Sequence, residues 1–119
     1  MLNTAEHSAP RAPRRLVGEK AHKLYFLETG KVDYIEADGN YVKIHVGENS
    51  YISRNTIKRL AETLAPAGFV RIERSLLVNL QHVAFAARLG HGAFALTLTS
   101  GRRLTSTPTY RRGILEALQ

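Results

Sequence analysis

Apolar and polar residues alternate along most of the chain, a pattern typical of strands that are buried on one face only. In the segment YVKIHV, Val42, Ile44 and Val46 share one face, and the residues between them share the other. Comparable segments, separated by turn residues, predict further strands over 23–28, 32–37, 50–54, 82–89, 93–99 and 102–106, with a strand and a turn over 69–80.

Two segments follow the period of a helix instead. In NTIKRLAETLAPAG, Ile57, Leu60 and Leu64 recur at helical spacing, and Asn55 or Thr56 can cap the start. A proline and a glycine at the end of this segment would stop the helix. Because the rest of the pattern is that of strands, the predicted fold class is mostly β with two short helices.

The second helix closes the chain. Thr107 is expected to cap it, and Pro108 fits its first turn because the N–H that proline lacks would have no partner there. Tyr110, Ile114 and Leu118 share one face at helical spacing, which predicts that these three side chains pack inward.

The length and composition fit one small domain. The chain has 119 residues, of which 44% are hydrophobic, and its lack of cysteine excludes disulfides and cysteine-based zinc sites. No apolar run is long enough to cross a membrane, and the N-terminus lacks the apolar centre of a signal peptide. We expect a cytoplasmic protein with a flexible basic arm over 1–22 and a folded domain over 23–119.

Positive charge is concentrated at the two ends of the chain, whose net charge is +7. Residues 71–119 carry seven arginines against two acids, and residues 1–23 carry five basic residues against two acids. Residues 24–70 carry five basic residues against six acids. A basic half that contains arginine but no lysine indicates a phosphate-bearing partner, because the guanidinium fork matches phosphate oxygens.

The sequence offers little for catalysis or cofactor binding. GHGAFA at 90–95 fits a loose dinucleotide pattern, but that pattern needs a following helix, and FALTLT predicts a strand. The five histidines lack metal-ligand spacing, and no serine lies in a nucleophile elbow. We therefore expect no enzyme activity, no metal and no cofactor.

The segment FVRIERSLLVNL at 69–80 combines a core strand with clustered polar residues. Val70 and Ile72 alternate with charged residues, and an unbroken apolar run follows Arg74 and Ser75. Arginine can bond O6 and N7 of guanine through two N–H groups, and serine can donate to a phosphate. Asn79, at the end of the run, is more typical of a residue that closes a turn through backbone hydrogen bonds.

Three blocks of the sequence resemble the LytTR family of bacterial DNA-binding domains. VDYIEADGNYVKIHV at 32–46 is similar to the opening of the family pattern, and the segment at 52–80 is similar to its middle, which ends in F-x-R-x-H-R-S-x-L-V-N. LTSGRRLTSTPTYRRGILEAL at 98–118 is similar to its closing hairpin and helix. The resemblance covers about residues 23–119 and implies an elongated, multi-stranded β fold.

The resemblance also implies a mode of DNA binding. Domains of this family place loops in successive major grooves on one side of the duplex, at sites that are usually paired direct repeats. In the loops that match the β-turn at 38–41 and the segment at 69–80, the residues expected at DNA are Asn40, Tyr41, Lys43, Arg71, Arg74 and Ser75. For Asn40 and Tyr41, a plain hairpin turn followed by a strand tyrosine stays open as the alternative.

Two positions depart from the family pattern. Glu73 replaces the usual histidine, and it could hold the Arg71 guanidinium, accept a hydrogen bond from cytosine, or be an ordinary surface charge. The last loop reads Ser-Thr-Pro where the family usually has Ser-Arg. We expect this loop to hold a phosphate and no longer to read bases, through Ser106, Thr107, Thr109 and Arg111.

Members of the family commonly carry a receiver domain or a membrane segment, and the sequence predicts neither here. A receiver would need about a hundred further residues, roughly a domain of its own. We therefore expect a stand-alone transcriptional regulator that binds duplex DNA, can form a dimer there, and receives its signal from a separate signalling or inhibitory protein.

Two other functions stay open at this stage. Tyr41, Lys43 and His45 on one strand face would suit stacking of bases in single-stranded DNA or RNA. The arginines could instead meet an acidic protein, which would make the domain an interaction module.

Overall fold

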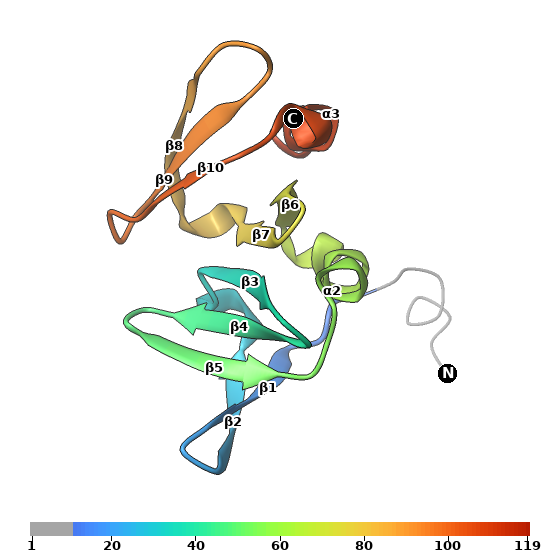
Figure 1. Ribbon diagram of the computed structural model, residues 1–119, viewed down its shortest axis with the longest axis vertical. Helices are drawn as coiled ribbons and strands as arrows, with labels where there is room; N and C mark the ends of the chain where they lie inside the picture. The colour runs from blue at the N-terminus through green and yellow to red at the C-terminus, as the bar shows by residue number, and fades with distance from the viewer. Residues whose placement is uncertain (1–10) are drawn as a thin grey trace, which may run out of the picture.

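The computed structural model describes residues 11–119, which form two antiparallel β-sheets and two short α-helices (Figure 1). The larger sheet has seven strands in the order β2-β1-β5-β4-β3-β7-β6, and the smaller has three in the order β10-β9-β8. The β1–β2 hairpin lies at one end of the long axis and the smaller sheet at the other (Figure 1). The predicted fold class, mostly β with two short helices, is confirmed.

The larger sheet consists of β1 (Arg15–Lys20), β2 (Lys23–Glu28), β3 (Tyr34–Asp38), β4 (Tyr41–Val46), β5 (Asn49–Ser53), β6 (Phe69–Glu73) and β7 (Leu76–Asn79). The smaller consists of β8 (Val83–Arg88), β9 (Phe94–Leu98) and β10 (Arg103–Thr105). The α-helices are α2 (Ile57–Leu64) and α3 (Arg111–Ala117), and four short 3₁₀-helices are η1 (Thr29–Lys31), η2 (Ala65–Ala67), η3 (Leu80–His82) and η4 (Pro108–Tyr110). None of the helices in residues 11–119 is long and apolar enough to cross a membrane.

The alternating segments pair as a meander, β3–β4–β5, at the centre of the larger sheet. Val42 and Ile44 of β4 are buried, as their alternation predicts. Asp38 and Tyr41 are the last paired residues of the β3–β4 hairpin, so Gly39 and Asn40 are the two central residues of its turn. Gly39 has φ of 63°, a backbone conformation that glycine adopts at little cost, so the turn is as tight as the sequence predicts.

Helix α2 packs on the larger sheet through its apolar face. Of the two candidate caps, Thr56 is the one that acts, because its Oγ1 accepts a hydrogen bond of 3.1 Å from the Arg59 N–H. Ile57, Leu60 and Leu64 are buried in the same cluster as the core residues of β3 and β4. The helical period read from the sequence is therefore confirmed.

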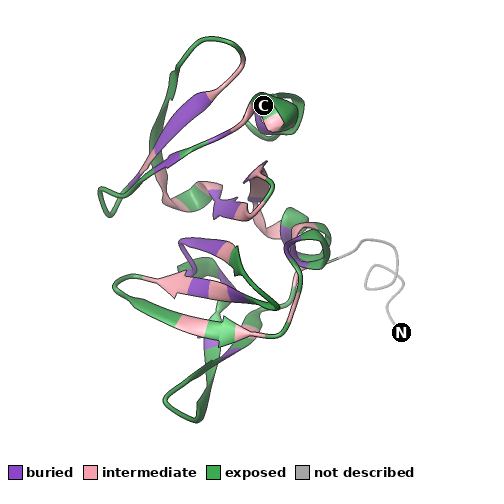
Figure 2. Cartoon of the chain, viewed as in Figure 1, coloured by how far each residue is buried: buried purple, intermediate pink, exposed green. Residues whose placement is uncertain are grey.

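The β6–β7 hairpin belongs to both hydrophobic cores of the molecule. Phe69 and Leu77 lie in the cluster under α2, whereas Ile72 and Val78 lie in a second cluster with the smaller sheet and Ile114 of α3. Figure 2 shows β7 buried between further buried segments on β9 of the smaller sheet and on β3 and β4 of the larger one. Because β7 is buried on both faces, its apolar run is unbroken. Strands that are buried on one face only alternate between apolar and polar residues.

The folded part of the chain begins earlier than the sequence pattern predicts. Arg15–Lys20, expected in a flexible arm, form β1, which pairs with all of β2 and with β5 through Glu19 and Ile52. The segment RLVGEK was missed because it has only two apolar side chains, one of which, Val17, is exposed. Residues 1–10 of the predicted arm lie outside the described residues.

The packing face of the C-terminal helix also differs from the prediction. Tyr110 and Ile114 pack in the second core, but Leu118 is 55% exposed and Leu115 packs there instead. The reason is that α3 ends at Ala117, so Leu118 is its C-cap residue and lies beyond the last helical turn that packs on the core. Thr107 occupies the N-cap position of η4, yet its side chain makes no capping hydrogen bond.

Removal of residues 1–22 is expected to destabilise the domain, because β1 lies between β2 and β5 and its loss leaves β2 without a partner strand. We expect Tm to fall by more than about 10 °C, since each kcal/mol lost shifts the Tm of a domain of this size by about 4–8 °C. Thermal unfolding followed by circular dichroism measures this change. An unchanged Tm would show that β1 contributes nothing to stability.

Candidate nucleic-acid interface

Three loops of the larger sheet meet around one shallow hollow of about 520 Å³. They are the β3–β4 turn, the start of α2 and the β6–β7 turn, which are distant in sequence. Lys58, Arg71 and Arg74 line the hollow against a single acid, Glu73, so its charge is positive. The structure thus brings together two of the three loops that the sequence predicted at DNA and adds the start of α2, whereas the last loop does not line this hollow.

The β3–β4 turn presents polar side chains beside this hollow. Asn40 is exposed, and the ring of Tyr41 is 39% exposed. Lys43 follows on the same strand face, but its Nζ lies 3.4 Å from the Asp38 carboxylate, which partly balances its charge. Asn40 and Tyr41 are therefore accessible to a ligand at this turn, and Lys43 is held a little further back.

The β6–β7 turn is closed by Glu73. Its carboxylate accepts hydrogen bonds from the Ser75 N–H at 2.8 Å and from the Ser75 hydroxyl at 2.7 Å. Glu73 makes no ion pair with Arg71 among residues 11–119, and the strand register shifts between these two residues, so they no longer follow simple alternation. The Glu73 carboxylate shapes the turn and accepts the hydrogen of the Ser75 hydroxyl. This role differs from the three that the sequence suggested for Glu73.

Arg71 supports the same turn from its other side. Its Nε and Nη2 donate to the Arg74 carbonyl oxygen at 3.2 and 2.6 Å, and its guanidinium lies 5.5 Å from the centre of the Tyr110 ring. Hydrogen bonds from a charged donor are stronger than neutral ones. Arg71 therefore fixes the turn backbone and links it to η4.

Arg74 is the free arginine of this turn. Its side chain is exposed and makes no hydrogen bond or ion pair with any of residues 11–119. The backbone on both sides of it is held by Glu73 and Arg71. A guanidinium on a fixed backbone, with its donors unused, is suited to bidentate recognition of guanine or phosphate.

The last loop does not gather the four residues expected to form a phosphate clamp. Ser106 is 2% exposed, and its Oγ accepts a hydrogen bond of 2.8 Å from the Phe94 N–H. This placement does not favour a contact between Ser106 and phosphate, since the hydroxyl serves the fold. Thr109 and Arg111 are exposed, Thr107 is half-buried, and Arg111 passes over Gly92 of the β8–β9 turn.

Asn79 has the structural role that the sequence suggested for it. Asn79 is fully buried, its Nδ2 donates to the Val32 carbonyl at 2.9 Å, and its Oδ1 accepts from the Gln81 N–H at 3.0 Å. The expectation that Asn79 closes a turn is therefore confirmed. Tyr34 is also buried, and this burial raises the pKa of its phenol above the usual value, against the opposing effect of Arg102.

Asn55 and Lys58 are residues of the hollow that reasoning from the sequence did not assign to the site. Asn55 lies just before α2 and Lys58 in its first turn, and the sequence pattern predicts where this helix starts but not which loops it faces. The residue that follows Asn55 donates its N–H to the Asn55 Oδ1 at 3.0 Å, so the amide group is held in place. Among residues 11–119, no group of His, Asp or Glu side chains is arranged to hold a metal ion.

Replacing Glu73 is expected to affect DNA binding through the turn. In Glu73→Ala the Ser75 N–H and hydroxyl lose their acceptor, and we expect sequence-specific affinity to fall by about 5- to 10-fold, which corresponds to the roughly 1 kcal/mol that an average hydrogen bond contributes. Glu73→Gln keeps an acceptor oxygen and should lose less. Binding to a fixed duplex, measured by fluorescence anisotropy, checks both, and a change of preferred base in Glu73→Gln would show direct contact with DNA.

Comparisons with known proteins agree with this geometry. A family model described as the LytTr DNA-binding domain matches residues 22–119. A solved LytTr DNA-binding domain from Bacillus cereus superposes with a TM-score of 0.83 at 20% identity, covering 90% of this chain and 98% of that one. The agreement of fold extends over nearly the whole solved domain.

Curated relatives include the CO-responsive transcriptional regulator RcoM of Rhodospirillum rubrum, 34% identical over 77 residues, or 64% of this chain and 33% of that protein. The sensory transduction protein LytT of Oceanobacillus iheyensis is 27% identical over 121 residues, or 99% of this chain and 49% of that protein. The chain thus spans a third to a half of these relatives. Since the family model covers most of the sequence, the chain belongs to the LytTR family of DNA-binding domains.

Proposed function

We propose that the protein is a transcriptional regulator that reads duplex DNA with the β3–β4 and β6–β7 turns placed in the major groove. The observation that carries this proposal is the Arg74 guanidinium, which has no partner among residues 11–119 and lies on a turn that Glu73 and Arg71 hold fixed. As a bacterial regulator of transcription it would act in the cytoplasm. By analogy with its family, the preferred site would be a pair of direct repeats, each bound by one copy.

The residues proposed at DNA differ in their roles. Arg74 would read a base, Asn40 and Tyr41 would contact a base or a phosphate, and Lys58 would contact a phosphate at the edge of the hollow. Arg71 would act mainly by positioning the turn. In the last loop, Thr109 and Arg111 stay available for phosphate contacts, whereas Ser106 does not.

Selection of bound sequences from random duplex DNA, with single-stranded DNA present as competitor, tests the proposal. An enriched pair of similarly oriented repeats is the expected result. No enrichment would remove sequence-specific duplex binding as the function. Base stacking on β4 is a weaker alternative, because His45 is tied to Glu36 at 2.7 Å and stacked on the buried Tyr34 ring.

DNA binding is expected to depend steeply on salt. Residues 71–119 carry seven arginines against two acids, and engagement of about four to six phosphates would release the corresponding counterions. A plot of the logarithm of the association constant for DNA against the logarithm of the salt concentration should then have a slope of about −4 to −5. Titrations of a labelled duplex at several salt concentrations give this slope, and a value near zero would count against DNA binding.

A further inference from the structure

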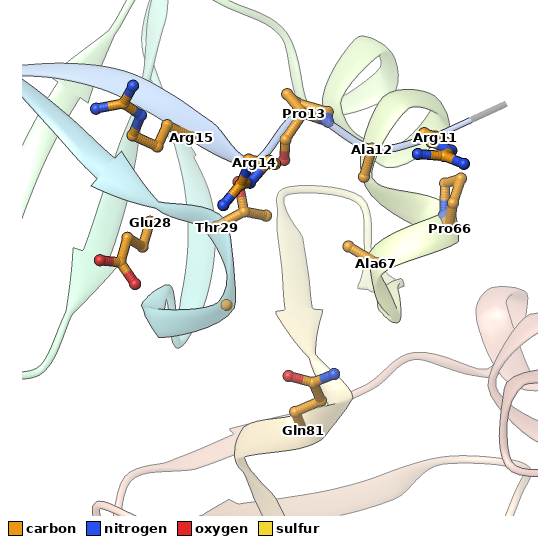
Figure 3. A pocket seen from close by; sticks show the side chains of 11 residues that line it. Arg11, Ala12, Pro13, Arg14, Arg15, Glu28, Thr29, Pro66, Ala67 and Gln81 are labelled. Atoms are coloured by element: carbon orange, nitrogen blue, oxygen red, sulfur yellow. The ribbon is translucent and has the colours of Figure 1, made fainter. Parts of the chain in front are cut away.

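Three arginines near the start of the described chain line a second hollow, of about 860 Å³ (Figure 3). Arg11, Arg14 and Arg15 come from the segment that leads into β1, and the opposite side is formed by Gln81 of η3. None of its lining residues is shared with the hollow between the DNA-facing loops. The second hollow is therefore a separate surface.

The backbone that carries these arginines is fixed to the body of the domain. The buried Thr29 donates its hydroxyl to the Pro13 carbonyl at 2.7 Å and its N–H to the Arg14 carbonyl at 2.9 Å. Ala12 packs against the core cluster under α2. The guanidinium groups thus start from defined positions, which reduces the conformational entropy that binding would cost.

The positive charge of this hollow is not balanced by the rest of the described chain. Within residues 11–119, none of the three arginines forms an ion pair, and the single acid in the lining, Glu28, lies 3.9 Å from the Lys31 Nζ. Arg15 is placed over the Phe26 ring at 5.7 Å. Arg11 and Arg14 are left with unused donors, which fit carboxylate or phosphate oxygens.

The floor between the arginines is apolar. Ala12 and Pro13 face Pro66 and Ala67 of the α2–β6 connection, and Figure 3 shows Arg11 beside Pro66 and Arg14 beside Thr29. A nucleic-acid backbone has phosphates but no apolar groups to fill such a floor. A peptide in which carboxylates alternate with apolar side chains offers both kinds of group.

The three arginines of this hollow lie outside the part of the sequence that matches the DNA-binding family. Arg11, Arg14 and Arg15 precede residue 22, where the match to the LytTr DNA-binding domain begins. The features that define the family therefore do not account for the cluster. Its surroundings are complementary to a negatively charged protein segment.

We propose that the hollow bounded by Arg11, Arg14 and Gln81 is a docking site for an acidic segment of a partner protein. Carboxylates of the segment pair with Arg11 and Arg14, and its apolar side chains rest on Pro13, Pro66 and Ala67. The Gln81 side-chain amide is placed to bond the peptide backbone from the other side. The partner can bind while the DNA-facing turns stay open, because the two surfaces share no residue.

The test uses the full chain and a fluorescent synthetic peptide in which glutamate and aspartate alternate with leucine. Its twin carries glutamine and asparagine in place of the acids. Binding is measured by fluorescence anisotropy for the parent, for Arg11→Gln/Arg14→Gln, and for Arg88→Gln/Arg103→Gln. The last variant loses the same charge from exposed arginines of the smaller sheet and is the matched control.

We expect the acidic peptide to bind the parent, the neutral twin not to bind, and the Arg11/Arg14 variant to weaken binding about fivefold or more. The control should change affinity less than twofold. Equal weakening by both variants would overturn the proposal, because the interaction would be one of net charge alone. Displacement of the peptide by single-stranded oligothymidylate at an equal concentration of negative charges would also overturn it, by making the hollow a nucleic-acid site.

Discussion

Arg74→Ala is expected to relax the base preference at one or two positions of each repeat and to cost about 1–3 kcal/mol of specific binding there. The Arg74 guanidinium makes no bond to residues 11–119, whereas its backbone carbonyl accepts two hydrogen bonds from Arg71. Removing the side chain therefore leaves the turn intact and takes away only the donors. Repeating the random-duplex selection with the variant shows which positions lose their preference.

The control for this experiment is Arg103→Ala, which removes an exposed arginine from β10, away from the hollow. It should lower affinity slightly and leave the selected sequence unchanged. If Arg74→Ala lowers affinity equally on the selected site and on a scrambled duplex, Arg74 contacts a phosphate and the assignment as a base reader is wrong.

Asn79→Ala is expected to cause a large loss of stability, about 2–5 kcal/mol. The Asn79 side chain is fully buried and serves the Val32 carbonyl and the Gln81 N–H at once. Truncation leaves the buried Val32 carbonyl without this partner, which costs about 1–3 kcal/mol, and it also removes the acceptor of the part-buried Gln81 N–H, at a smaller cost. Urea unfolding followed by circular dichroism measures the free energy of unfolding.

Asn49→Ala is the matched control for this substitution. Asn49 is exposed and accepts a single hydrogen bond, from the Lys20 Nζ at 2.7 Å. We expect its truncation to change the free energy of unfolding by less than about 0.5 kcal/mol, as for most surface sites. A loss below 1 kcal/mol in Asn79→Ala would mean that the structure around η3 relaxes to satisfy both groups.

The fold was predictable where a local pattern decides the structure. Val42 and Ile44 alternate with polar residues, and Ile57, Leu60 and Leu64 keep a helical spacing, so both elements follow from neighbours in sequence. Strand β1 was not predictable in this way, since it depends on pairing with β2 and β5. Likewise, the spacing of Ile114 and Leu118 does not reveal that α3 ends at Ala117 and leaves Leu118 exposed at its C-cap.

The candidate site was predictable as a set of loops but not as a set of contacts. The resemblance to the family pointed to the turns that hold Asn40 and Arg74, and the structure places both at one hollow. The bond from Ser75 to Glu73 depends on the shifted register of β6. The burial of Ser106 depends on an N–H twelve residues away in the chain, which no local sequence pattern reveals.

The membership of β6–β7 in two cores has a consequence for how the protein opens. Neither core can come apart without uncovering one face of this hairpin, on which Ile72 and Leu77 are fully buried toward opposite sides. Local fluctuation of the turn between the two strands is therefore coupled to the global unfolding of the domain. Amide hydrogens of Leu77 and Val78 should exchange with solvent at the rate set by complete unfolding, so the loop that carries Arg74 is anchored in the slowest-exchanging part of the molecule.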